Sequence, residues 1–246
     1  TNRCFCYTVK NGNVVMRMKP YCCAVLAAAG NSVRMGQCKQ FLPLLGVPAM
    51  VYTLRAFELA GGIEEIILVC KLQDRAPLEA CISKAGVTKP VSFVQGGATR
   101  QQSVAAGVRA CCSKTDFVVI HDAARALITP QLIEQAIHDA VVYGAAALAV
   151  PVKDTVKIAD ESGFVTATPN RNALWAVQTP QVFLRTGYLH ALELAEKDRK
   201  DYTDDCQLLE NAGVKVHLCL GSYENLKLTT KEDIAVAEAL LKNREG

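Results

Sequence analysis

A stretch with clear chemical potential begins where an apolar run, residues 24–29, ends at Gly30. Arg34 and Lys39 follow that glycine and lie five residues apart. Backbone N–H groups in such a turn, together with two cations, form a suitable binding site for a polyphosphate. An ordinary turn between a strand and a helix, followed by two solvated charges, has the same pattern. Both interpretations stay open when this stretch is read alone.

A carboxylate, Asp122, directly follows His121 and the apolar run at residues 117–120. Beside a polyphosphate loop it could bind Mg²⁺, because this ion prefers one or two carboxylates together with phosphate oxygens. It could equally cap a helix. Arg125 could bind phosphate or pair with Asp122, and His121 is interpreted as structural because no nucleophile is placed beside it.

A pair of glycines, Gly96 and Gly97, precedes Arg100 and Ser103. This group could bring backbone atoms and a hydroxyl to the edge of a nucleobase, although any turn between a strand and a helix can hold two glycines. The chain has no Ser-His-Asp arrangement, no P-loop motif and no dinucleotide-binding glycine motif after residues 24–29. These absences argue against a P-loop ATPase and against an ordinary dinucleotide fold.

Alternating strands and helices would position these residues. Apolar runs predict buried strands, and the segments between them have helical spacing or helix-starting residues. The predicted strands cover residues 24–29, 66–70, 91–94, 117–120 and 145–150, and the predicted helices cover residues 47–60, 76–85, 100–112 and 130–143. This order predicts an α/β fold with a mostly parallel sheet and helices on both faces. Because ligands bind outside the carboxyl ends of such strands, the turns near Gly30, Gly97 and Asp122 are expected to converge on one crevice.

The alternation stops after residue 150. Residues 152–158 alternate in polarity, residues 160–163 are typical of a turn, and residues 164–168 can return, which predicts a projecting β-hairpin arm at about 151–176. A two-stranded ribbon is marginal alone, so the arm is expected to pack on a second subunit, with folding back on its own domain as the alternative. Beyond the arm, helices are predicted at residues 186–197, from residue 203 and at residues 230–241, and strands at residues 214–220 and 225–228.

The bulk properties favour one globular domain over residues 21–246. Residues 1–20 are expected to be an extension, disordered or left by processing, and the fold prediction omits them. A net charge of +3 does not favour a nucleic-acid partner, and no apolar run is long enough to span a membrane. The eleven cysteines include no C-x-x-C pair, so they suggest neither a disulfide framework nor a zinc site and suit the cytoplasm.

Several blocks of the sequence, in order from about residue 21 to the end, resemble motifs of the 2-C-methyl-D-erythritol 4-phosphate cytidylyltransferase family. These blocks are Ala27-Ala28-Ala29-Gly30 with Arg34-Met35-Gly36 and Lys39-Gln40, Ile120-His121-Asp122-Ala123-Ala124-Arg125, Pro151-Val152-Lys153-Asp154-Thr155, Leu174-Trp175 with Gln178-Thr179-Pro180-Gln181, and Asn225-Leu226-Lys227. The resemblance implies a Rossmann-like nucleotidyltransferase that transfers a cytidylyl group from CTP to methylerythritol phosphate and releases pyrophosphate, on the non-mevalonate route to isoprenoid precursors. It also implies a divalent cation, usually Mg²⁺, and a homodimer whose arms complete each other's sites.

The resemblance also implies a role for individual residues. Arg34, Lys39 and Lys227 would be catalytic; Ala28, Ala29, Gly30, Asn31, Gly97, Arg100 and Ser103 would bind the nucleotide; Asp122, Arg125, Thr155, Arg171, Thr179 and Thr203 would bind the acceptor, with Asp122 also at the metal. Thr155 and Arg171 would come from the neighbouring arm. An ionised phosphate needs no general base, so the site must position two anions and neutralise their charge. The span from Arg34 to Lys39 is shorter than the family pattern, and Ala98 stands where an acidic residue can help to recognise the base.

Two other functions compete with this prediction. A cytidylyltransferase for another polyol phosphate, such as ribitol 5-phosphate, would differ mainly in the acceptor pocket around Arg171 and the arm. A nucleotide-binding regulator without catalysis would not need Arg34, Lys39, Asp122 and Lys227 together. A turnover assay with CTP and both acceptors separates all three.

Overall fold

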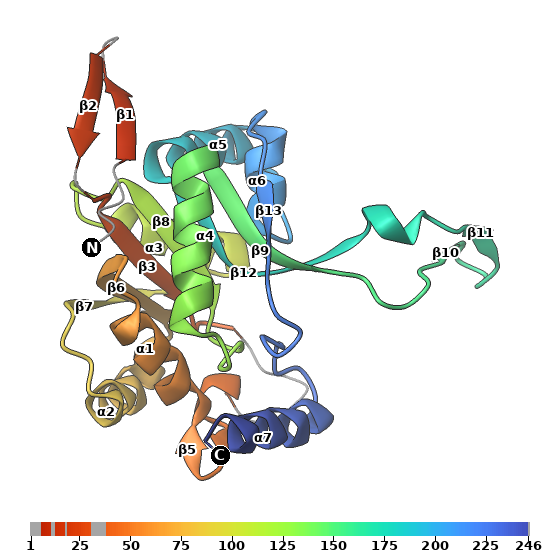
Figure 1. Cartoon of the computed structure of the whole chain (residues 1–246), viewed down its shortest axis with the longest axis horizontal. Helices are drawn as coiled ribbons and strands as arrows, with labels where there is room; N and C mark the ends of the chain where they lie inside the picture. Colours follow the sequence, from red (N-terminus) through yellow and green to blue (C-terminus); the bar gives the residue numbers. More distant parts are fainter. Residues whose placement is uncertain (1–5, 11–12, 18, 31–37, 246) are drawn as a thin grey trace.

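The computed structural model describes residues 6–10, 13–17, 19–30 and 38–245. At its centre lies a seven-stranded sheet with the order β13-β9-β12-β8-β3-β6-β7 (Figure 1). Its strands are β3 (Cys22–Ala27), β6 (Ile63–Cys70), β7 (Val91–Gln95), β8 (Phe117–Asp122), β9 (Ala145–Pro151), β12 (Trp175–Leu184) and β13 (His217–Leu220). Only β12 pairs antiparallel with its neighbours, β8 and β9, and the other pairs in this sheet are parallel. The predicted mostly parallel sheet is confirmed.

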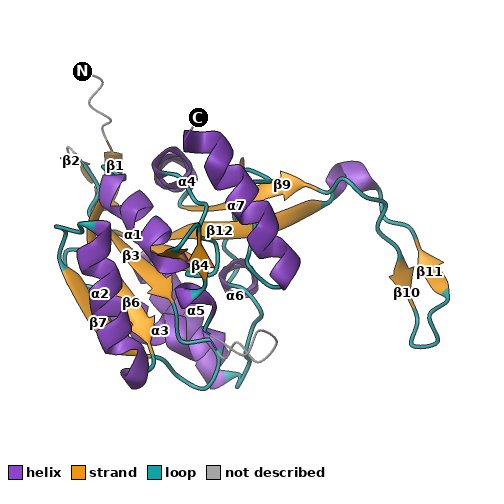
Figure 2. Cartoon of the chain, turned by 90° about the horizontal axis from the view of Figure 1, so that it is seen from below, coloured by secondary structure: helices purple, strands orange, loops and turns teal. Residues whose placement is uncertain are grey.

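Helices cover both faces of this sheet (Figure 2). They are α1 (Ala49–Leu59), α2 (Arg75–Ala85), α3 (Arg100–Ala110), α4 (Pro130–Tyr143), α5 (Arg185–Lys197), α6 (Asp205–Asn211) and α7 (Lys231–Glu245). Successive side chains of a strand point to opposite faces, so Leu26 of β3 packs in the layer of α1, α2 and α4, whereas Val25 packs in the layer of α3, α5 and α6. The two layers sandwich β3 and β8, whose carboxyl ends therefore have a rigid support.

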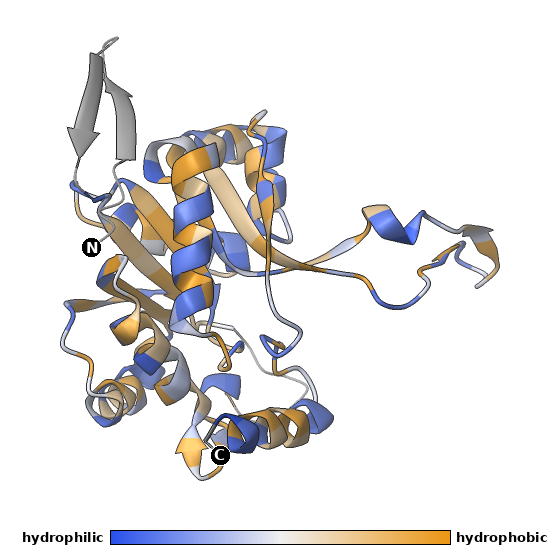
Figure 3. Cartoon of the chain, viewed as in Figure 1, coloured by the Kyte–Doolittle hydropathy of each residue, from blue (hydrophilic) through white to orange (hydrophobic). Residues whose placement is uncertain are grey.

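Local sequence signals explain the ends of α4. Pro130 occupies its first turn, the Thr129 hydroxyl accepts a hydrogen bond from the backbone N–H of Leu132, and Gly144 ends the helix at a φ of 86°. The predicted bounds of this helix are confirmed. In Figure 3, α4 carries a hydrophilic face, whereas strands β3 and β9 are coloured mainly as hydrophobic.

The predicted strand at residues 225–228 is wrong. The Asn225 side chain is fully buried and donates through Nδ2 to Gln178 Oε1 at 3.2 Å and to the Thr179 carbonyl at 2.9 Å. The Leu228 N–H donates to the Ala124 carbonyl at 2.8 Å. The alternating polarity thus comes from a loop that is held at Asn225 and at Leu228, and Lys227 between these two residues is exposed.

Other boundaries also differ from the prediction. Strand β5 (Val47–Pro48) pairs with β4 (Pro43–Leu44), so the first long helix begins only at Ala49. Strand β13 begins at His217 rather than at residue 214.

Helix α7 supports the loop that carries Lys227. Leu228 is fully buried in a cluster with Ala237 and Leu241 of α7 and with Leu44 and Leu127. Within the described ranges, no helix has the length and the apolar character needed to cross a membrane.

Residues outside the predicted domain also form regular structure. Strands β1 (Cys6–Lys10) and β2 (Asn13–Arg17) pair antiparallel in the extension that the fold prediction omitted. The division into an extension and a domain at residues 20 and 21 stays a prediction.

The projecting arm is confirmed. Between the end of β9 and the start of β12, the short strands β10 (Ile158–Ala159) and β11 (Val165–Ala167) pair antiparallel and extend away from the sheet (Figures 1 and 2). The arm carries exposed hydrophobic side chains at its tip, and Phe164 is 73% exposed. It does not fold back on its own domain.

Candidate active site

A cavity of about 480 Å³ opens at the carboxyl ends of β3, β6, β7 and β8. It is lined by the turn after β3, by the glycine loop, by the start of α3, by the end of β8, by the loop after β13 and by three lysines from different segments. These lining residues include Ala27, Ala28, Ala29, Gly30, Lys39, Gln40, Lys71, Gly96, Gly97, Ala98, Thr99, Arg100, Ser103, Asp122, Ala123, Ala124 and Lys227. The expected convergence of the three turns on one crevice is confirmed.

The glycines are required because the loop after β7 packs directly against its surroundings. A Cβ atom at Gly96 would lie 2.3 Å from the Cβ of Ala29, and one at Gly97 would lie 2.5 Å from the Cβ of Gln102. The Ser103 hydroxyl accepts from the Gly97 N–H at 3.1 Å and donates to the Thr99 carbonyl at 2.9 Å. This loop is therefore held close to the turn at Ala29 and presents its backbone to the cavity.

Asp122 holds two cations at the floor of the cavity. Its Oδ1 lies 3.1 Å from Arg100 Nε, and its Oδ2 lies 2.7 Å from Lys227 Nζ. Burial would raise the pKa of Asp122, but the charges of Arg100 and Lys227 outweigh burial and hold it well below its usual range. The carboxylate is ionised at neutral pH.

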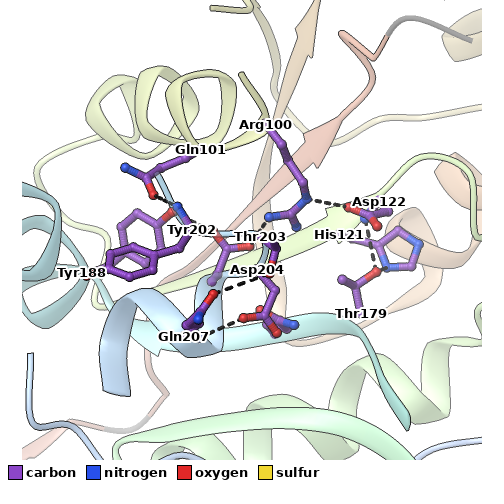
Figure 4. Close-up of polar contacts among 12 residues, drawn as sticks. Arg100, Gln101, His121, Asp122, Thr179, Tyr188, Tyr202, Thr203, Asp204 and Gln207 are labelled. Carbon is purple, nitrogen blue, oxygen red and sulfur yellow. Dashed lines mark hydrogen bonds and ion pairs between the residues drawn. The ribbon is translucent and has the colours of Figure 1, made fainter. Parts of the chain in front are cut away.

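Arg100 bridges Asp122 to a second carboxylate on α6. Its Nη1 lies 2.7 Å from Asp205 Oδ2, and the Tyr188 hydroxyl donates to Asp205 Oδ1 at 2.7 Å. Burial opposes the charge on Arg100, but Asp205 and Asp122 raise the pKa of the guanidinium above its ordinary value. Figure 4 shows the Arg100 side chain reaching from α3 to Asp122. Helices α3, α5 and α6 thus fix this arginine together.

A second series of hydrogen bonds contacts the backbone of Asp122. The Asp122 N–H donates to Thr179 Oγ1 at 3.0 Å, and that hydroxyl lies 3.1 Å from His121 Nδ1. His121 Nε2 donates to the Arg125 carbonyl at 3.2 Å. Burial lowers the pKa of His121 to about 4, so its ring is neutral at pH 7. Figure 4 shows the ring, the hydroxyl and Asp122 in contact.

Arg125 lies beside the cavity rather than in its lining. Its Nη1 donates to the Asn225 carbonyl at 2.7 Å and its Nη2 reaches the Val177 carbonyl at 3.5 Å. Burial lowers the pKa of Arg125, and its buried Nε has no hydrogen-bond partner among the described residues. In the described part of the chain, the ion pairs of Asp122 are made with Arg100 and Lys227, not with Arg125.

Four other predicted residues lie away from the lining. Thr179 is 4% exposed, and Thr203 is exposed beside a separate cavity of about 430 Å³ next to α6. Thr155 and Arg171 lie on the arm, where Arg171 Nη1 donates to the Lys153 carbonyl at 2.9 Å. Two further predicted residues, Arg34 and Asn31, lie outside the described residues.

The sequence prediction missed three polar residues that shape the site. Asp205 and Tyr188 anchor Arg100, and Gln40 Nε2 donates to the Ala28 carbonyl at 3.0 Å and so ties the turn after β3. For Asp205 the available signal was the acidic pair at the start of α6, where the sequence predicted only the beginning of a helix. Tyr188 has the spacing of a core residue and gave no signal.

The side chains fit a divalent cation only together with a ligand. Within the described residues, no cluster of three or more His, Cys, Asp or Glu side chains could hold a metal ion. Asp122 is a single ionised carboxylate at the cavity floor, and Mg²⁺ completes such a donor set with phosphate oxygens and water. The donors therefore suit Mg²⁺ brought in with a polyphosphate.

Comparisons with known proteins agree with this geometry. Residues 22–243 match the family model of 2-C-methyl-D-erythritol 4-phosphate cytidylyltransferase. Proteins of that name from Desulforamulus reducens and Pelotomaculum thermopropionicum are 45% and 42% identical, over 90% and 91% of this chain and 96% and 95% of theirs. The crystal structure of 4-diphosphocytidyl-2C-methyl-D-erythritol synthase from Anaerococcus prevotii is 31% identical, covers 91% of this chain and 96% of its own, and has a TM-score of 0.82. The chain belongs to the 2-C-methyl-D-erythritol 4-phosphate cytidylyltransferase family and is a nucleotidyltransferase.

Proposed function

We propose that this chain transfers the cytidylyl group of CTP to 2-C-methyl-D-erythritol 4-phosphate, in the synthesis of isoprenoid precursors. A phosphate oxygen of the acceptor attacks the α-phosphorus of CTP, and the bond to the bridging oxygen of the β-phosphate breaks. The products are the cytidine diphosphate ester and pyrophosphate. The observation that carries this proposal is the cavity that is lined by Lys39 and by the ionised Asp122 with its two paired cations, Arg100 and Lys227.

The nucleotide would lie along the turn after β3 and the glycine loop. Backbone groups of Ala28, Ala29, Gly30 and Asn31 would receive the triphosphate, and Gly97, Arg100 and Ser103 would border the base and ribose. Lys39, Arg34 and Lys227 would neutralise charge that develops around the α-phosphorus, since cations fixed near a reacting phosphate favour the transition state. The closeness of Gly96 to Ala29 supports this arrangement, because it brings both backbone segments to one cavity.

We further propose that Asp122 holds Mg²⁺ together with phosphate oxygens of CTP. The bound ion would supply charge neutralisation between two anionic substrates. The pKa of Asp122, held below its usual range, keeps the carboxylate ionised and supports this role.

The acceptor would lie between Asp122, Arg125 and Thr203 and the arm of a second copy, and the buried Thr179 would support this pocket from behind Asp122. We propose a homodimer in which the partner's arm brings Thr155 and Arg171 to the site. Two observations support it: the arm projects from its own domain, and its side chains Phe164, Val165 and Ile158 are 73%, 58% and 51% exposed.

We also propose that the protein works in the cytoplasm. None of the nine cysteines whose side chains the structure describes forms a disulfide, which suits a reducing compartment.

The deciding experiment measures pyrophosphate release from CTP with methylerythritol phosphate and, separately, with ribitol 5-phosphate. We expect rapid release with the first acceptor, little with the second, and loss of activity when Mg²⁺ is removed by a chelator. Faster turnover of ribitol 5-phosphate would overturn the proposed acceptor. Tight CTP binding without release of pyrophosphate in any mixture would indicate a regulator instead.

A matched pair of variants tests whether the described cavity carries the activity. Lys39→Ala should abolish most turnover, whereas Lys84→Ala, an exposed change on α2, should leave it unchanged. Equal activities in the two variants would show that the reaction occurs elsewhere.

A further inference from the structure

His121 is a fully buried polar residue to which the proposed reaction assigns no role. It lies at the end of β8, with its ring centroid 5.2 Å from that of Phe57. Both ring nitrogens are nevertheless engaged, Nε2 with the Arg125 carbonyl and Nδ1 with Thr179 Oγ1. A residue that only filled the core would not need both contacts.

The partners of His121 fix the direction of each hydrogen bond in the series that runs from the Arg125 carbonyl through His121 and Thr179 to the Asp122 N–H. The Arg125 carbonyl only accepts, so Nε2 of the ring carries the proton. The ring is fully buried and neither of its hydrogen-bond partners carries a charge, so the ring is neutral and Nδ1 is an acceptor. The Thr179 hydroxyl must therefore donate to Nδ1.

The same hydroxyl accepts the Asp122 N–H at 3.0 Å. Its single proton is used by His121, so it has no proton left to donate to a bound anion. Thr179 is also buried, with 4% exposure. Its hydroxyl is thus oriented inside the protein and acts on the backbone of Asp122.

The sheet explains why a side chain is needed at this point. The pairing of β12 with β8 ends at Gln181 and Ile120, and the register of β12 against β9 shifts between Val177 and Gln181. The backbone ladder from β12 therefore stops before Asp122. Thr179, inside the irregular stretch, supplies a side-chain acceptor for the Asp122 N–H instead.

We propose that His121 and Thr179 form a positioning pair that fixes the backbone of Asp122, so that its carboxylate meets Arg100 and Lys227 in the geometry that transfer requires. This inference rests on the proposed function for its kinetic consequence. Its structural consequence, an ordered Asp122 N–H, is independent of which substrate is used. Loss of a group that orients a metal-ligating side chain typically changes metal affinity or activity by ~10–100-fold, and the proposed function places Asp122 at Mg²⁺.

Two substitutions at His121 separate its two hydrogen bonds. In His121→Asn the amide oxygen can accept near the position of Nδ1, but the bond to the Arg125 carbonyl is lost. In His121→Gln a donor reaches the position of Nε2, but the acceptor for Thr179 is lost. We expect His121→Asn to keep kcat within about threefold, and His121→Gln to lower it by ~10-fold or more with KM for CTP little changed.

Substitutions at Thr179 test the other member of the pair and leave the packing of the buried His121 side chain in place. Thr179→Val should lower kcat as much as His121→Gln, and Thr179→Ser should restore it. The double variant with His121→Gln and Thr179→Val should have a kcat no lower than that of the slower single variant, because both changes break the same series of hydrogen bonds. His190→Asn, an exposed change on α5, serves as the control and should match the parent.

Amide hydrogen exchange provides a readout that needs no turnover. In Thr179→Val the Asp122 N–H should exchange at least ~10-fold faster, while the Val119 N–H in the same strand keeps its rate. Unchanged exchange at Asp122, or equal losses of kcat in His121→Asn and His121→Gln, would overturn the positioning pair. If the parent protein does not turn over methylerythritol phosphate but the exchange pattern appears, the proposed function fails and the positioning pair stands.

Discussion

Replacing Asp205 with alanine is expected to destabilise the fold by about 3 kcal/mol. The change leaves Arg100 with one carboxylate partner and leaves the buried Tyr188 hydroxyl without its acceptor. Breaking a buried ion pair by removing one partner costs about 3–5 kcal/mol. The Arg100 side chain is 28% exposed whereas that of Asp205 is 2% exposed, so water can partly solvate the remaining arginine and the lower end of that range applies.

Urea denaturation at pH 7 measures this effect. The midpoint should fall while the slope of the free energy against urea concentration stays constant, since the same surface is exposed on unfolding. Asp204→Ala is the matched control, because Asp204 caps α6 by accepting from the Gln207 N–H and does not touch Arg100. That control should lose only about 1 kcal/mol.

The hydroxyl of Tyr188 gives a second test of the same network. Tyr188→Phe should cost about 1 kcal/mol, and the double variant with Asp205→Ala should cost less than the sum of the two single changes. A loss below about 1 kcal/mol for Asp205→Ala, equal to its capping control, would refute the argument that this carboxylate anchors Arg100.

Four further outcomes follow from the site. In the folded protein the pKa of His121 is about 4, below its ordinary value of 6.5. Between these two pH values the unfolded chain binds more protons than the folded protein. The free energy of unfolding therefore falls as the pH drops from 6.5 to 4. Urea unfolding at pH 7 and pH 4.5 should show a loss of about 2–3 kcal/mol that His121→Asn removes and His190→Asn retains. Lys39→Ala should lower kcat by ~10²–10³ with little change in melting temperature, and unchanged kinetics would contradict its role. Arg171→Ala should mainly raise KM for the acceptor, and an isolated loss of CTP affinity would count against it. Mixing Lys39→Ala with Arg171→Ala should restore about a quarter of the parent activity if arms are exchanged in a dimer, and no restoration would exclude that exchange.

The order of strands and helices in the first part of the fold could be predicted from the sequence, because apolar runs, helix caps and turn residues lie close together along the chain. Pro130 and Gly144 mark both ends of α4, and the apolar runs that became β3 and β8 are bounded by turns. The antiparallel entry of β12 between β8 and β9 could not be predicted, since it depends on pairing between residues that are 24 to 67 positions apart. The interpretation of residues 225–228 as a strand failed for the same reason. Their alternation records contacts of Asn225 and Leu228 with distant segments.

The site residues likewise fall into those with a local sequence signal and those that depend on distant contacts. Gly96, Gly97 and Asp122 stand at strand ends and were identified from position alone, and the resemblance to a family added Lys227. Asp205 was missed because its partner Arg100 lies 105 positions away. A single sequence carries no sign of such a pair, and an aspartate after a turn is more often a helix cap.

Strand β12 runs from Trp175 at the root of the arm to Leu184 in the middle of the sheet, and Thr179 lies within it. No loop separates the segment at the root of the arm from the residue that touches Asp122. If two copies assemble through their arms, a single strand then joins the dimer contact to the reacting centre and provides a route by which the two binding events can be thermodynamically linked. Any factor by which a docked arm changes the affinity for a ligand at this site is also the factor by which that ligand changes the affinity of one subunit for the other.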